Sequence, residues 1–261
     1  MGRSKCRMQN AKCRMIPYIL LILLFLVVFL FSVFQVYRQL REQKQVFVQN
    51  EILLEEAVKT VELPTAVVEE APICAPVEVD FDALLEKNPH VVGWLYCEGT
   101  NINYPVVQGA DNEQYLRRLL DGTYNRAGTI FLDSRNAADF SQWNSIVYGH
   151  NMKDDTMFAL LPSYADPAFY EAHPVWWLLT PEKQYQVELF AGYATEPNAL
   201  LYTLPEGEAE QQMVLEYAAR FSDFETKFER SETARFITFS TCLYDAKDSR
   251  YVLMGILKEA Q

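Results

Sequence analysis

The feature that most restricts the possible folds of this chain is a run of 21 residues without a charge. It extends from Ile16 to Val36 and reads "IPYILLILLFLVVFLFSVFQV". As a helix rising 1.5 Å per residue the run is roughly 30 Å long, which is the thickness of the hydrocarbon core of a bilayer. A cleavable signal peptide has a shorter apolar core and a small-residue exit, whereas this run ends in Phe31, Phe34 and Tyr37. The sequence therefore predicts an uncleaved membrane anchor; a buried core helix is the alternative.

The charges on either side of the run predict its orientation. The first 14 residues hold five basic residues and no acid, and three basic residues follow the run within residues 38–44. An excess of Lys and Arg marks the cytoplasmic side of a membrane helix. We therefore expect a basic cytoplasmic tail over residues 1–15, a single-pass anchor over 16–37, and the remainder outside the cell membrane.

The part of the chain beyond the tail is strongly acidic. The formal net charge is −12, and removing the tail's charge of +5 leaves −17 for residues 15–261. Such a surface repels the phosphates of nucleic acids and anionic lipid headgroups. The composition thus predicts no nucleic-acid partner, and contact with membrane lipid only through the apolar helix.

A stalk and one folded domain are predicted to follow the anchor. Residues 38–78 read as an amphipathic stretch and then as "LPTAVVEEAPICAPVEV", with three prolines and no glycine. Such a composition is typical of a semi-rigid, partly extended segment. Residues 79–261 are enough for one domain with its own hydrophobic core.

The outer domain is predicted to be mostly β. Eight short runs are rich in β-branched and aromatic residues and are separated by Gly, Asn, Asp and Pro. The runs cover residues 91–97, 102–108, 128–134, 144–150, 175–180, 185–194, 235–241 and 250–258. Many short strands without regular intervening helices favour a closed antiparallel barrel or a sandwich over a Rossmann sheet.

Three helical insertions are predicted among the strands. Asp80 is expected to cap a short helix that ends before Pro89, and a second helical piece follows His150. The third lies within residues 206–224, where apolar residues at helical spacing predict a docking stripe. The stripe consists of Met213, Val214, Tyr217, Ala218 and Phe221.

The cysteines indicate a free nucleophilic thiol. Cys6 and Cys13 precede the apolar run; the other three, without a short-spaced pair, are neither a disulfide framework nor a zinc-ligand pattern. Cys97 lies within an apolar strand pattern and is predicted to be buried, and Cys74 lies in the stalk. Cys242 ends the run "FITFST" beside two hydroxyl residues, so it is the candidate for chemistry.

Cysteine catalysis also needs a group that cycles a proton. His90 sits at a helix-to-strand turn and is predicted to be solvated, and His173 precedes a proline and is predicted to end a helix or pack. His150 closes "SIVYGH", an apolar strand followed by a glycine, which places an imidazole at the mouth of a strand. His150 is therefore the candidate acid and base, and a structural role is the alternative.

Arg250 is the candidate for charge stabilisation. It opens the last apolar run after the loop "LYDAKDS", so pairing of the two runs would return it beside Cys242. A guanidinium stays charged and donates hydrogen bonds in a fork, which suits an oxyanion or a substrate carbonyl. The alternative is an ion pair with Asp245 or Asp248 in the loop.

Taken in order, "YGHNM", "STC" and an arginine shortly before the final apolar run resemble the sortases, the cysteine transpeptidases of bacterial cell surfaces. Three longer stretches resemble the class B branch, so that the resemblance covers roughly residues 80–258. They read "VVGWLYCEGTNINYPVVQGADNEQYL", "AGTIFLDSRN" and "YGHNMKDDTMFALLPSYADPAFYEAHP". One departure is the linker of seven residues between Cys242 and Arg250, which is short for class B and bears on the rim of the groove.

The resemblance implies an eight-stranded sortase β-barrel with N-terminal helices and a helix between the late strands. It implies that Cys242 is the nucleophile, His150 the general acid and base, and Arg250 the stabiliser of the oxyanion or substrate. It also implies a groove for the sorting peptide, lined by Asn112, Leu116, Tyr148 and Ser240. It brings in no organic cofactor, and the sequence holds no evident metal-ligand cluster.

The implied reaction is transpeptidation at a Gram-positive surface. Surface proteins carrying a C-terminal signal resembling Leu-Pro-x-Thr-Gly or Asn-Pro-x-Thr-x would be cleaved at the Thr carbonyl through a thioacyl enzyme. An amine of the peptidoglycan precursor or cross-bridge would then receive them. A pilin-polymerising sortase is the alternative within the family. A cysteine endopeptidase that uses water, and a non-catalytic surface-binding module, are the alternatives from other classes.

Overall fold

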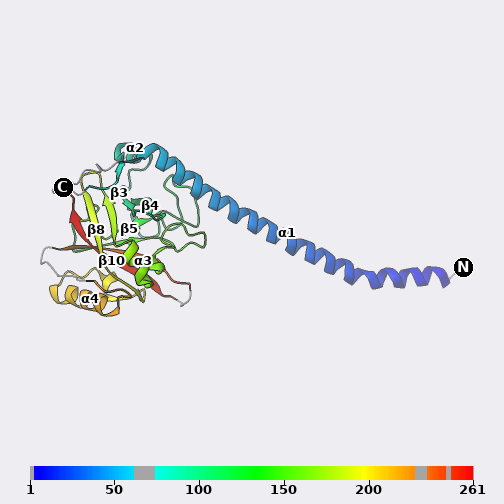
Figure 1. The fold of residues 1–261 in the computed structure, drawn as a ribbon. Coiled ribbons are helices and arrows are strands. Elements are labelled where there is room, and N and C mark those ends of the chain that lie inside the picture. Colours follow the sequence, from blue (N-terminus) through cyan, green and yellow to red (C-terminus); the bar gives the residue numbers. More distant parts are fainter. Residues whose placement is uncertain (1–2, 62–73, 227–233, 245–247, 261) are drawn as a thin grey trace. The chain divides into compact units, whose positions relative to one another are not determined.

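The computed structural model describes residues 3–61, 74–226, 234–244 and 248–260, with side chains from Pro17 onward (Figure 1). The chain divides into two compact units, whose boundary falls between Gln45 and Val46. Helix α1 (Arg3–Ala57) contributes to both units.

The first unit is the N-terminal part of α1. Its side chains from Pro17 to the end of the apolar run are exposed or, at Gln35, half-buried. Within the described part of the chain, α1 is the one helix long and apolar enough to cross a membrane. An exposed apolar surface of this length is stable in a bilayer and not in water, which agrees with the predicted anchor.

The second unit begins with the last turns of α1. Val46, Leu53 and Ala57 are buried among residues of the β domain. The strand β1 (Val58–Thr60) then pairs antiparallel with β2 (Val77–Val79). Residues 46–61 and 74–78 of the predicted stalk therefore belong to the second unit, and the proline-rich middle of the stalk, residues 62–73, lies outside the described residues.

Helix α2 (Phe81–Lys87) forms where the sequence predicts it. The Asp80 Oδ1 atom accepts a hydrogen bond of 3.0 Å from the backbone N–H of Ala83, which satisfies one of the free donors at the helix start. Leu84 is fully buried against the barrel. This helix confirms the predicted cap.

The eight predicted runs form one closed barrel, so the predicted fold class is confirmed. The order of neighbours around it is β10-β8-β7-β3-β4-β5-β6-β9. The strands are β3 (Val91–Tyr96), β4 (Asn103–Val107), β5 (Phe131–Leu132), β6 (Asn144–Tyr148), β7 (Val175–Leu179), β8 (Gln184–Thr195), β9 (Arg235–Cys242) and β10 (Arg250–Glu259).

Two pairs of neighbours in the barrel are parallel, which corrects the expectation of an antiparallel barrel. They are β4 with β5 and β6 with β9. A parallel pair requires a long crossover between its strands. The chain between β6 and β9 supplies one, because it contains β7, β8 and the helix α4 (Glu208–Phe221).

Side chains along β9 point alternately into the barrel interior and to the face that carries Cys242. Ile237 and Phe239 point into the interior, where the Phe239 ring stacks on Trp176 with centroids 4.5 Å apart. Because side chains alternate along a strand, Ser240 and Cys242 point to the opposite face. The outer barrel surface at this end of β9 is therefore where the candidate nucleophile lies.

Helical insertions follow β6 and β8. They are η1 (Leu161–Ala165), α3 (Pro167–Ala172), η2 (Leu200–Thr203) and α4. The predicted stripe on α4 is partly wrong. Val214 and Ala218 are buried as expected, but Met213, Tyr217 and Phe221 are 55%, 44% and 47% exposed, because the helix docks through Val214, Leu215 and Ala218.

Candidate active site

Cys242 is the last residue of β9 and an exposed free cysteine. The strand β9 lies between β6 and β10 in the barrel, so residues of two strands flank the thiol. Cys97 lies in a different environment. It is 1% exposed, and burial raises the pKa of its thiol to about 11, which confirms the prediction of a buried small hydrophobe.

His150 lies level with Cys242 on the β6 side. The parallel register pairs Tyr148 with Ser240, and two hydrogen bonds extend it beyond the strand. The Gly149 N–H donates to the Ser240 carbonyl at 3.2 Å, and the Asn151 Nδ2 atom donates to the Cys242 carbonyl at 3.0 Å. Residues 149–151 therefore run alongside residues 240–242.

Gly149 is required by close packing at this turn. A Cβ atom built at position 149 would lie 2.6 Å from the Cδ2 atom of Phe158, a ring fully buried in the core. Such an approach is far inside van der Waals contact, so a larger residue would displace the chain that carries His150. This explains the glycine in "YGH" by packing rather than by conformation.

The backbone of Leu116 fixes the imidazole of His150. The Nε2 atom lies 2.8 Å from the Leu116 carbonyl oxygen. A carbonyl can only accept, so Nε2 carries a proton and Nδ1 is the nitrogen that can gain or lose one. Burial lowers the pKa of His150, the Leu116 carbonyl opposes this shift, and the charge of Arg117 adds to it.

Arg250 lies on the other side of Cys242. It is the first residue of β10, and the antiparallel register places it directly opposite Cys242. Its Nη1 atom donates to the Ser249 carbonyl at 3.4 Å. No ion pair joins it to Asp248 in the described structure, and Asp245, the other suggested partner, lies outside the described residues. Its guanidinium therefore forms no ion pair with Asp248.

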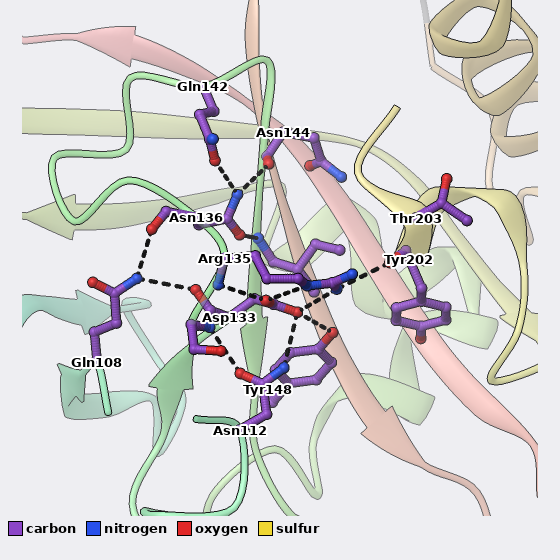
Figure 2. Close-up of polar contacts among 12 residues, drawn as sticks. Gln108, Asn112, Asp133, Arg135, Asn136, Gln142, Asn144, Tyr148, Tyr202 and Thr203 are labelled. Carbon is purple, nitrogen blue, oxygen red and sulfur yellow. Dashed lines mark hydrogen bonds and ion pairs between the residues drawn. The ribbon is translucent and has the colours of Figure 1, made fainter. Parts of the chain in front are cut away.

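The four predicted groove residues lie around the same face. Leu116 contributes its carbonyl to His150, and Ser240 is buried with its hydroxyl 2.7 Å from the hydroxyl of Tyr202. The side chains of Asn112 and Tyr148 both donate to the Oδ2 atom of Asp133, at 3.1 Å and 3.0 Å (Figure 2). The structure therefore gathers residues from β6, β9 and the loop before β5.

The sequence analysis missed three polar residues of this face. Asp133, Arg135 and Tyr202 link the groove residues to one another (Figure 2). A usable signal was present in "FLDSR", where an acid and a base two residues apart follow directly on a buried strand. Tyr202 carries no comparable signal, because η2 has no regular apolar pattern.

No metal site accompanies these residues in the part of the chain that the structure describes. Three or more His, Cys, Asp or Glu side chains do not gather anywhere among those residues in a way that could hold an ion.

Comparison with curated proteins finds two sortases. The chain is 32% identical to sortase B of Staphylococcus aureus over 182 residues, which are 69% of this chain and 75% of that protein. It is 37% identical to sortase B of Listeria monocytogenes over 177 residues, 67% of this chain and 72% of that protein. No family model matches the chain.

Solved structures agree with the sequence relatives. A Staphylococcus aureus sortase B–substrate complex matches with a TM-score of 0.64 and 32% identity, over 69% of this chain and 84% of that one. Sortase B of B. anthracis matches with a TM-score of 0.69 and 28% identity, over 85% and 99%. A Streptococcus pyogenes class B sortase involved in pilus biogenesis matches with a TM-score of 0.63 and 29% identity, over 69% and 98%.

Proposed function

The chain belongs to the class B sortases, which are cysteine transpeptidases, and from this premise we propose that Cys242 is its nucleophile, His150 its general acid and base, and Arg250 its oxyanion stabiliser. The observation that carries the proposal is the register of β9. Its parallel pairing with β6 and its antiparallel pairing with β10 bring His150 and Arg250 to the two sides of one exposed thiol.

The proposed first step forms a thioester. The Cys242 thiolate attacks the Thr carbonyl carbon of the sorting signal, and the carbonyl oxygen becomes an oxyanion that accepts hydrogen bonds from Arg250. The tetrahedral intermediate collapses as His150, protonated on Nδ1, gives that proton to the departing amine. The C–N bond breaks, and the acyl group remains on the Cys242 sulfur.

The proposed second step transfers the acyl group. An incoming primary amine loses a proton to Nδ1 of His150 and attacks the thioester carbon, and Arg250 again stabilises the oxyanion. The C–S bond then breaks, which yields a new amide and returns the thiolate–imidazolium pair. The Leu116 carbonyl supports this role, because it keeps the same nitrogen available in both steps.

The proposed substrates are surface proteins with a C-terminal signal resembling Leu-Pro-x-Thr-Gly or Asn-Pro-x-Thr-x. The groove for this peptide is formed by Asn112, Leu116, Tyr148 and Ser240, which surround the face that carries Cys242. The proposed acceptor is an amine of the peptidoglycan precursor or its cross-bridge. Pilin polymerisation is the second candidate, because a matching class B sortase of Streptococcus pyogenes is involved in pilus biogenesis.

The test of this function is a transfer reaction with the full chain in detergent. We expect a library of sorting-signal peptides, mixed with candidate cell-wall amines, to yield peptides cleaved after Thr and joined to an amine. Mass spectrometry separates the new amide from a free acid. Free acid as the sole product in the presence of every amine would identify an endopeptidase instead, and binding of the peptides without cleavage would identify a binding module.

The helix α1 is proposed to be an uncleaved anchor with a cytoplasmic N-terminus, because its apolar run is uncharged and five basic residues precede it. Protease added to intact cells with a permeable wall is expected to degrade the barrel domain and to leave the N-terminal segment in the membrane pellet. Immunoblotting with tags at both ends measures this. A soluble form cut near residue 37 would show that the run is a signal peptide.

A further inference from the structure

We infer that Asp133 is a positioning residue that holds one wall of the sorting-peptide groove together, and so controls capture of the peptide rather than the reactivity of Cys242. The inference rests on the proposed function, since it concerns the same groove. It adds a residue that contacts neither the sulfur nor the imidazole, together with its partners Arg135 and Tyr202.

Asp133 is completely buried and accepts five hydrogen bonds. Its Oδ1 atom accepts from the backbone N–H and the Nε atom of Arg135, at 3.0 Å and 2.9 Å. Its Oδ2 atom accepts from the Nη2 atom of Arg135, the hydroxyl of Tyr148 and the Nδ2 atom of Asn112, at 2.8 Å, 3.0 Å and 3.1 Å (Figure 2). One carboxylate thus joins two of the proposed groove residues.

Arg135 extends the network to a second segment. The Nη2 atom that binds Asp133 also donates to the Tyr202 carbonyl at 3.0 Å, which ties η2 to the end of β5. The Tyr202 hydroxyl lies 2.7 Å from that of Ser240, and its ring stacks on Tyr148 with centroids 6.4 Å apart. Asn112 and Tyr148 are therefore bound to Asp133 directly, and Ser240 is linked to it through Tyr202 and Arg135.

Asp133 carries a negative charge in this network. Burial alone would raise its pKa, but the hydrogen bonds from Arg135 and Tyr148 outweigh burial, and the pKa of Asp133 is lowered. A buried carboxylate with this many donors orients all of them, because a donor that moved away would lose its hydrogen bond to the carboxylate. The arrangement makes the wall rigid before a peptide arrives.

The network also defines what Tyr148 can offer to a peptide. Its hydroxyl donates to Asp133, and burial raises the pKa of Tyr148 further above its ordinary value, so the phenol remains protonated. The hydroxyl proton is committed to this bond, so Tyr148 has no second proton to donate to a peptide. Asp133 therefore fixes the orientation of the Tyr148 ring, which is stacked on Tyr202.

Replacing Asp133 with asparagine tests the inference. In Asp133→Asn an amide N–H₂ replaces the Oδ2 atom and faces three donors, so Tyr148, Asn112 and Arg135 lose their shared acceptor. We expect the KM for a sorting-signal peptide to rise by about tenfold or more, with kcat changed by less than about threefold. Alkylation of Cys242 by iodoacetamide, which needs no groove, should keep its wild-type rate.

Three further variants make the test decisive. Arg135→Lys keeps the charge but removes the fork, and we expect the same shift in KM to a smaller extent. Tyr148→Phe added to Asp133→Asn should raise KM little further, because the bond between them is already lost. The control is Asp223→Asn, which neutralises the carboxylate that accepts from the Tyr251 hydroxyl at 3.0 Å in the segment after α4 and should leave KM unchanged.

The outcomes separate this inference from the proposed function. If the wild type acylates and Asp133→Asn retains its KM, or if the effects of Asp133→Asn and Tyr148→Phe are additive, the inference is overturned while the proposed function stands. Slower alkylation of Cys242 in both Asp133→Asn and Arg135→Lys would also overturn it, because the site would then be disturbed as a whole. A wild type that forms no thioacyl enzyme would instead contradict the proposed function.

Discussion

Cys242→Ala is expected to abolish formation of the thioacyl enzyme. The variant removes the atom that bonds to the acyl group, and the buried Cys97 cannot replace it. Cys97 is enclosed in the barrel and its thiol stays protonated, because burial raises its pKa to about 11. Incubation with a sorting-signal peptide, followed by mass spectrometry of the intact protein, detects the acyl adduct. We expect an adduct on the wild type and none on Cys242→Ala.

The matched control is Cys97→Ala, which removes the same atom from the barrel interior. Cys97 is buried in the core, so we expect a loss of a few tenths to about 2 kcal/mol in the free energy of unfolding. Acylation should persist at the wild-type rate per folded molecule. The assignment of the nucleophile fails if Cys97→Ala is the inactive variant and Cys242→Ala still forms an adduct.

The strands of this barrel were predictable because their signal is local. Each of the eight runs combines β-branched and aromatic residues between turn residues, and each contains a strand in the structure. The parallel pairing of β6 with β9 was not predictable in this way, because no local pattern encodes which distant strand becomes the neighbour. The exposed face of α4 was mispredicted for a related reason. Helical spacing defines a face, but not its width or its centre.

The candidate site likewise contains residues that a local pattern predicts and residues that only the folded chain identifies. Cys242, His150 and Arg250 stand out because each begins or ends an apolar run, where the end of a strand presents a side chain. Asp133 also follows an apolar run, but an aspartate in that position is most often a turn residue. Its significance depends on Asn112 and Tyr148 approaching from two other segments, and only the folded chain brings these segments together.

The effect of replacing Arg250 is measured against the pH dependence of acylation. Burial lowers the pKa of His150 below its ordinary 6.5. Below that lowered value the imidazole is already protonated and cannot take up the thiol proton; at high pH the imidazole is neutral and cannot protonate the leaving amine. Activity should therefore be bell-shaped, with an acid limb below pH 6.5, and the limbs belong to the coupled Cys242–His150 pair. His150→Ala should lose nearly all turnover.

Arg250→Lys should lower the maximum of this profile by roughly 10²-fold or more without moving its limbs. A guanidinium does not titrate in this range, and lysine keeps the charge but lacks the fork that fits a carbonyl oxygen. The loss is on the scale of removing one oxyanion donor. Single-turnover acylation from pH 5 to 10 measures it.

The matched control is Arg235→Lys at the opposite end of β9, where the guanidinium lies over the Tyr185 ring. Seven residues at 3.3 Å each place Arg235 about 23 Å from Cys242. That control should acylate normally. An Arg250→Lys enzyme with a near-normal rate would mean that Arg250 serves the loop between β9 and β10, because a residue facing the oxyanion could not lose its donor geometry without a cost in rate.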